Sequence, residues 1–190
     1  MIKAVVFDAG GVLILEPDSK DRLKLYQEFH KEPDYSLLNI GKITLGEMLK
    51  RVAKRGTLSD QELIRLKNFI LKDRSFNKVL HRYGLSLKKR GLKIGICSNN
   101  SRTVFDTWNR TFHFTHGYEP YVRVSARVGL IKPEKRIFLM MSRLLGVKPS
   151  EMIFVDDRAD NVRGAIAAGV KAIRFTSNRD VIRKIEKLLK

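Results

Sequence analysis

Five short apolar or β-branched runs recur along the chain. They are AVVF at 4–7, IGIC at 94–97, YVRVS at 121–125, MIFV at 152–155 and KAIRF at 171–175. Segments with helical periodicity lie between the last four runs, and this alternation is typical of a parallel sheet covered by helices on both faces. We therefore predict an α/β fold with a Rossmann-like, doubly wound parallel sheet.

The segment between the first two predicted strands is much longer than a single crossover helix requires. It contains two capping boxes, Thr44 with Glu47 and Ser59 with Glu62, in which a hydroxyl and a carboxylate satisfy the free backbone N–H groups of a helix start. Apolar residues at helical spacing follow each box. Two helices are expected here.

An earlier helix is expected to begin near Asp18. Its apolar positions are Leu23, Tyr26 and Phe29. These helices together predict a small α-helical cap over residues 17–75, inserted into a core formed by residues 1–16 and 76–190.

The charge of the chain is strongly positive, with a net value of +18. Residues 76–150 hold 15 Lys or Arg residues and three acids. This excess suits an anionic substrate or partner, although it also suits a well-solvated surface. The basic doublets fall on predicted helices without interleaved aromatic residues, so nucleic acid is a possible partner but not the favoured one.

The single cysteine, Cys97, excludes an intrachain disulfide framework. The apolar run before Asp8 is too short for the core of a signal peptide, and no stretch reaches the length of a membrane span. We expect a cytoplasmic protein that has no membrane association.

Polar side chains follow three of the predicted strands, at the end where open α/β sheets bind their ligands. They are Asp8, Ser98, Asn99, Asp156 and Asp157. A basic residue, Lys132, lies just before a helix that Pro133 is expected to initiate, and it can project into the same crevice.

Three carboxylates brought together repel one another unless a cation neutralises them, so the cluster predicts a hard divalent metal, Mg²⁺. Asp8 can then attack phosphorus as a nucleophile, while Lys132, Ser98 and Asn99 contact the transferring phosphoryl group. The chemistry indicated is phosphoryl transfer.

From residue 4 to residue 176 the chain resembles the haloacid dehalogenase-like hydrolase superfamily. VVFDAGGVL, ICSNNS, IKPE and FVDDRADN are similar, in order, to its four motifs. The resemblance implies Asp8 as nucleophile, Ser98 as phosphate-binding hydroxyl and Lys132 as the conserved cation. It also implies a metal held by Asp8, the Gly10 carbonyl and Asp156.

Two further residues of the fourth motif support that site. The resemblance places Asp157 and Asn161 around the metal without direct coordination. Asn161 stands where the family has its last acidic residue, which weakens the usual support for Lys132. Asp160 is interpreted as a helix-start residue, and Trp108, His113 and His116 are expected to pack in the core or at the surface.

The chain departs from the family at Gly10. Typical phosphatases of the family have an aspartate two residues after the nucleophile, which protonates the leaving group and later activates water. Either a substitute such as Glu16 supplies this chemistry, or the leaving group needs no proton.

The favoured interpretation is a Mg²⁺-dependent phosphatase of a small phosphorylated metabolite. One alternative is a 2-haloacid dehalogenase, since those enzymes also lack the second aspartate; the intact Asp156 and Asp157 pair argues against it. Another is a weakly active relative that binds phosphate-bearing ligands or nucleic acid. The sequence predicts neither the exact substrate nor the oligomeric state.

Overall fold

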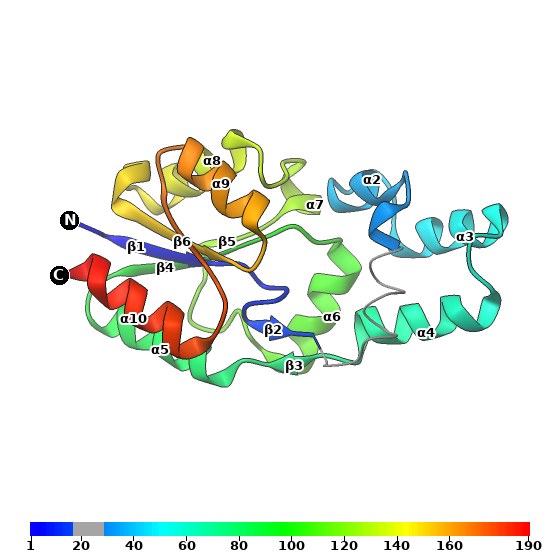
Figure 1. Ribbon diagram of the computed structural model, residues 1–190, viewed down its shortest axis with the longest axis horizontal. Helices are drawn as coiled ribbons and strands as arrows, with labels where there is room; N and C mark the ends of the chain where they lie inside the picture. The colour runs from blue at the N-terminus through cyan, green and yellow to red at the C-terminus, as the bar shows by residue number, and fades with distance from the viewer. Residues whose placement is uncertain (17–28) are drawn as a thin grey trace.

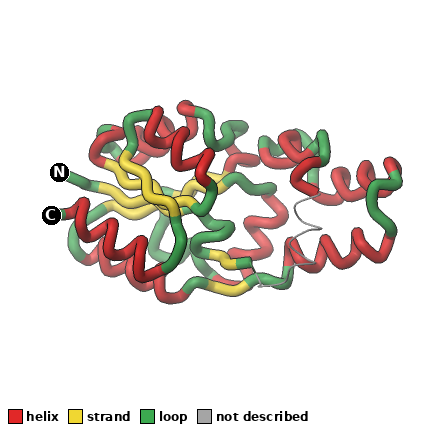
Figure 2. Tube along the Cα trace, in the orientation of Figure 1, coloured by secondary structure: helices red, strands yellow, loops and turns green. Residues whose placement is uncertain are grey.

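The five predicted strands form one parallel sheet in the computed structural model, which describes residues 1–16 and 29–190 (Figures 1 and 2). The strand order is β5-β4-β1-β6-β7. The strands are β1 (Ala4–Phe7), β4 (Lys93–Ser98), β5 (Val122–Val124), β6 (Met152–Asp156) and β7 (Lys171–Arg174). Each of the five sequence runs is therefore confirmed as a strand, with ends that differ by at most one residue.

Helices cover both faces of this sheet, as Figure 1 shows. α8 (Lys135–Leu145) and α9 (Ala159–Ala167) lie on one face, and α5 (Lys78–Lys89) and α10 (Asn178–Leu189) lie on the other. The side chains of β1 alternate between the two cores: Ala4 and Val6 pack with α8, whereas Val5 and Phe7 pack with α5 and α10. The predicted doubly wound α/β architecture is confirmed.

Three further elements belong to the described core. They are α6 (Arg102–Phe112), α7 (Ser125–Val128) and the 3₁₀ turn η1 (Pro149–Glu151). α6 follows β4, and the hydroxyl of Ser101 caps its N-terminus by accepting the N–H of Val104.

The inserted segment is helical where the structure describes it. It contains α2 (Tyr35–Asn39), α3 (Leu45–Arg55) and α4 (Asp60–Leu71), which lie together at one end of the molecule (Figure 1). The capping boxes predicted at Thr44 and Ser59 are both present. The start expected near Asp18 falls outside the described residues, whereas Phe29, the last apolar position of that expected helix, is buried in a helical turn at 29–31. The exact limits of the cap stay a prediction.

A short antiparallel ribbon joins the two ends of the insertion. β2 (Ile14–Leu15) pairs with β3 (Ser75–Phe76), so the chain enters and leaves the inserted segment side by side. The sequence did not reveal this ribbon, because two-residue strands carry no readable periodicity.

None of the described helices is both long and apolar enough to cross a bilayer. Cys97 is buried in β4 as a free thiol, and its burial raises its pKa to about 12. That environment makes it a packing residue.

Candidate active site

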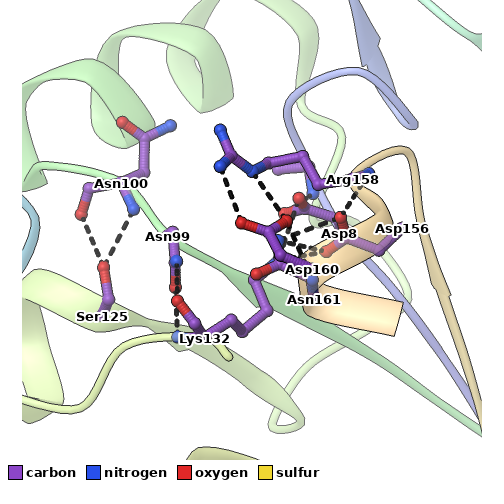
Figure 3. A network of polar contacts seen from close by, with 10 residues as sticks. Asp8, Asn99, Asn100, Ser125, Lys132, Asp156, Arg158, Asp160 and Asn161 are labelled. Atoms are coloured by element: carbon purple, nitrogen blue, oxygen red, sulfur yellow. Dashed lines mark hydrogen bonds and ion pairs between the residues drawn. The ribbon is translucent and has the colours of Figure 1, made fainter. Parts of the chain in front are cut away.

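Two carboxylates and one ammonium group form the floor of the site (Figure 3). Lys132 Nζ lies 2.8 Å from Asp8 Oδ2 and 2.7 Å from Asp156 Oδ2, and all three side chains are buried. Asp8 follows β1 and Asp156 ends β6, and these strands are neighbours in the sheet. Parallel pairing therefore brings the two carboxylates to the same edge, as the sequence predicted.

The electrostatic balance of this cluster is uneven. Burial raises the pKa of Asp8 well above its ordinary value, the charges of Asp156 and Asp157 add to this, and Lys132 opposes it. Burial would lower the pKa of Lys132, but the charges of Asp156 and Asp8 outweigh it and raise that pKa. One ammonium group thus faces more negative charge than it neutralises, which favours binding of a further cation.

Asp157 adds the third carboxylate. Burial, followed by the charge of Asp156, raises its pKa to about 6. Oxygen atoms of Asp8, Asp156 and Asp157 lie within 4.8 Å of one another. An all-oxygen donor set with excess negative charge fits a hard divalent cation such as Mg²⁺.

Hydrogen bonds fix the orientation of Asp156. The side-chain amide of Asn161 donates to both carboxylate oxygens, at 3.0 and 3.1 Å, and the backbone N–H of Arg158 donates to Oδ1 at 2.9 Å. Asn161 therefore orients the carboxylate of Asp156. Lys132 keeps two carboxylate partners although position 161 is not an acid. The expected weakening of support for Lys132 is not seen, because its partners come from β1 and β6.

Asn99 positions Lys132 from the neighbouring strand. Its side-chain amide donates to the Lys132 carbonyl at 2.7 Å, and its side-chain oxygen accepts the Lys132 N–H at 2.8 Å. The following helix, α8, begins at Lys135 and not at Pro133, so Lys132 lies on a loop that Asn99 anchors. This pair of bonds is visible in Figure 3.

The loop after β4 supplies a polar wall. Ser98 is buried at the end of β4, while Asn99 and Asn100 line the cavity above the carboxylates. The backbone N–H of Asn100 donates to the hydroxyl of Ser125 at 2.9 Å, which connects this wall to α7 (Figure 3).

The two glycines after Asp8 differ in their surroundings. Gly11 has a φ of +74°, and a Cβ there would lie 2.5 Å from the carboxylate carbon of Asp157. At Gly10 a Cβ would lie 3.7 Å from the Trp108 ring, an ordinary contact, and φ is not in the left-handed region. Gly11, and not Gly10, is the position that requires glycine.

We expect Gly11→Ala to lower the free energy of unfolding by about 1–2 kcal/mol, because alanine is strained at positive φ and its methyl group displaces Asp157. Gly10→Ala is the matched control and should change the free energy of unfolding by less than about 0.5 kcal/mol. Urea unfolding of each variant measures this free energy. Equal midpoints for the two variants would contradict this assignment.

A cavity of about 490 Å³ lies above the cluster. Core residues line its floor, including Asp8, Lys132 and Asp157, and inserted residues line its other side. The inserted residues are His30, Tyr35 and Asn39. The sequence did not single them out, since their approach to the strand ends depends on how the insertion packs on the core.

Glu16, the substitute acid considered from the sequence, lines the cavity and forms an ion pair with Arg74 at 2.9 Å. Arg74 is buried beneath the rings of Phe69 and Trp108. Trp108 also donates its indole N–H to the Ile70 carbonyl at 2.8 Å. Trp108 therefore packs in the interior and also connects α6 to the insertion. Glu16 lies at the same junction between the core and the insertion.

Asp160, His113 and His116 are the other residues considered from the sequence. Asp160 pairs with Arg158 at the rim of the cavity. His113 and His116 are exposed in the segment after α6, as their assignment as surface or packing residues suggested.

The sheet order, the acidic cluster at the strand ends and the helical insertion together define a Rossmann-like α/β protein with a buried carboxylate site. A profile of the haloacid dehalogenase-like hydrolases matches residues 2–169, and the chain belongs to this family.

Individual relatives agree with this membership. A glyceraldehyde 3-phosphate phosphatase of Methanopyrus kandleri is 33% identical over 93 residues, which are 48% of this chain and 39% of that protein. The matched segment thus spans well under half of that curated relative's length.

Solved structures extend the similarity to the whole chain. A HAD-like hydrolase of Porphyromonas gingivalis has a TM-score of 0.78 at 25% identity and covers 100% of this chain and 98% of its own. A HAD family enzyme of Bacteroides thetaiotaomicron, solved with magnesium and inorganic phosphate, has a TM-score of 0.67 at 20% identity and covers 93% of this chain and 95% of its own. The second likeness concerns the fold alone.

Proposed function

We propose that the protein is a Mg²⁺-dependent phosphatase that hydrolyses a small phosphorylated metabolite through an aspartyl-phosphate at Asp8. The observation that carries this proposal is the buried cluster in which Lys132 bridges Asp8 and Asp156, with an oxygen of Asp157 within 4.8 Å of theirs. The phosphatase named among its relatives supports the substrate class.

In this proposal Asp8 attacks the phosphorus atom and displaces the leaving group in line. Lys132 neutralises the negative oxygens of the transferring group, and Ser98 and Asn99 donate hydrogen bonds to the phosphate. Because Lys132 is already ordered by Asn99 and two carboxylates, it needs no rearrangement to do so.

Asp8, Asp156 and the Gly10 carbonyl are the proposed direct ligands of Mg²⁺, with Asp157 and Asn161 around them. The ion would supply a Lewis acid that polarises a phosphoryl oxygen and offsets the negative charge of the acids. The magnesium and phosphate of the Bacteroides structure are consistent with this choice of cation.

The same cluster favours a phosphatase over a 2-haloacid dehalogenase. A metal-independent displacement of halide has no use for a second and a third carboxylate beside the nucleophile, and here both are present and buried or partly buried. Binding of nucleic acid through the basic residues 76–150 is the second alternative, and steep loss of DNA retention with salt would be its signature.

Substrate screening tests the proposal. A panel of phosphomonoesters, acyl phosphates and 2-haloacids is assayed with Mg²⁺ and with EDTA. We expect turnover of one or more phosphorylated compounds with Mg²⁺ and none with chelator. Chelator-insensitive release of halide would instead establish the dehalogenase, and no turnover of the phosphate compounds would remove the phosphatase proposal.

A further inference from the structure

The cavity lacks a carboxylate at Gly10, but it holds other side chains able to exchange a proton. Among the described residues that line it, they include Glu16, His30, Asp157 and Asp160. Their positions relative to the reacting phosphorus decide which of them can replace the missing aspartate.

The three carboxylates are poorly placed for this role. Asp160 pairs with Arg158 at 2.8 Å at the rim of the cavity. Glu16 forms its ion pair with Arg74, which lies buried at the junction with the insertion. Asp157 packs against the backbone of Gly11 and belongs to the acidic cluster around Asp8 and Asp156. Asp157 is therefore on the nucleophile's side of the cavity.

His30 comes from the opposite side. It lies in the helical turn 29–31 of the insertion, whereas Asp8 rises from the carboxyl end of β1. In an in-line displacement, the leaving group and later the attacking water lie opposite the nucleophile. They therefore face the insertion, where His30 lines the same cavity.

The ring of His30 is held in place by aromatic packing. Its centroid lies 4.3 Å from that of Tyr35, and Tyr35 in turn packs edge-on against Phe29 at 5.8 Å. A ring positioned in this way needs little reorientation to accept a proton, which is the property required of a general base.

We propose that the His30 imidazole is the general base that activates water to hydrolyse the aspartyl-phosphate, in place of the carboxylate that Gly10 cannot supply. This inference rests on the proposed phosphatase function. In the step, the water oxygen bonds to phosphorus, and an imidazole nitrogen takes the water proton. The bond between phosphorus and Asp8 breaks, its electron pair returns to the carboxylate, and inorganic phosphate leaves.

The electrostatics of the cavity keep this base in its accepting form. Burial, together with the positive charges of Arg158 and Arg74, lowers the pKa of His30 to about 4. The imidazole is therefore neutral at pH 7 and able to accept a proton.

The decisive measurement is pre-steady-state hydrolysis of 4-nitrophenyl phosphate with Mg²⁺. Nitrophenolate is a good leaving group that needs no proton, so loss of the base slows only the second half-reaction. For His30→Gln we expect a burst of about one nitrophenolate per enzyme, followed by a steady-state rate about 10²–10³-fold below wild type. Acid quenching should then recover a stable amount of acyl phosphate on the protein.

Two controls separate chemistry from structure. His116→Gln replaces an exposed histidine and should behave like wild type. Imidazole added to His30→Gly should restore part of the steady-state rate, which no purely structural role of His30 would allow.

The outcomes distinguish this inference from the function on which it rests. If the wild type turns over the substrate and His30→Gln matches it, or slows without a burst, the assignment of His30 is overturned. A burst in Glu16→Gln but not in His30→Gln would assign the base to Glu16. If the wild type releases no nitrophenolate with Mg²⁺, the phosphatase proposal fails and this inference fails with it.

Discussion

Replacement of Lys132 by methionine is expected to lower the free energy of unfolding by about 3–5 kcal/mol, measured by urea unfolding at pH 7 in EDTA. Methionine fills much of the same volume but leaves Asp8 and Asp156 buried without the ammonium group that lies 2.8 and 2.7 Å from them. Removal of one partner from a buried ion cluster leaves uncompensated charge, which costs far more than loss of an exposed ion pair.

Lys135→Met is the matched control. Lys135 is exposed at the first turn of α8, three residues from Lys132, and its loss should change stability by less than about 0.5 kcal/mol. Equal unfolding midpoints for the two variants would show that the two carboxylates do not depend on Lys132 when no metal is bound.

Asp156→Asn is expected to reduce Mg²⁺-dependent phosphatase turnover by about 10³-fold or more. The amide keeps the shape of the side chain but removes the charge of a proposed metal ligand, and several kcal/mol of charge stabilisation are lost with it. The rise in Tm that Mg²⁺ gives the wild type should also disappear, because a ligand stabilises only the protein that binds it. Thermal melts with and without Mg²⁺ record this independently of activity.

Asp180→Asn controls for the loss of one carboxylate. Asp180 lies on α10, where it pairs with Arg183 and Lys184 at the surface, and its replacement should leave both turnover and the effect of Mg²⁺ unchanged. Unaltered turnover in Asp156→Asn, together with insensitivity to EDTA, would favour the dehalogenase alternative.

The core of the fold was readable because each central strand is a continuous apolar run. β1 and β6 are buried along their whole length, so their sequences are hydrophobic without alternation, and a polar residue marks where each one ends. These polar residues at the strand ends are Asp8 and Asp156, so the same pattern predicted both site carboxylates. Lys132 is predicted from its place before Pro133 and from its motif, and its bridging position follows once the order of β1 and β6 is known.

The side of the cavity contributed by the insertion was not readable in this way. His30 and Tyr35 carry no motif, and their approach to the strand ends depends on contacts between the insertion and α6, such as the bond from Trp108 to Ile70. The engagement of Glu16 with Arg74 has the same origin, since those residues are 58 positions apart and meet only through the β2–β3 ribbon. The spacing of apolar and polar residues predicts helices and strands within one segment. It does not predict contacts between residues that are far apart in the sequence, and these contacts are of that kind.

The β2–β3 ribbon also makes the insertion exchangeable. Because Leu15 is paired with Ser75, the chain that leaves the core returns to it at an adjacent backbone position. A two-residue hairpin turn could join these strands directly, and closing so short a loop costs less entropy than closing the natural one. The ribbon is therefore a graft point, at which a different cap could be installed to select another substrate while the strands that carry Asp8 and Asp156 stay in register.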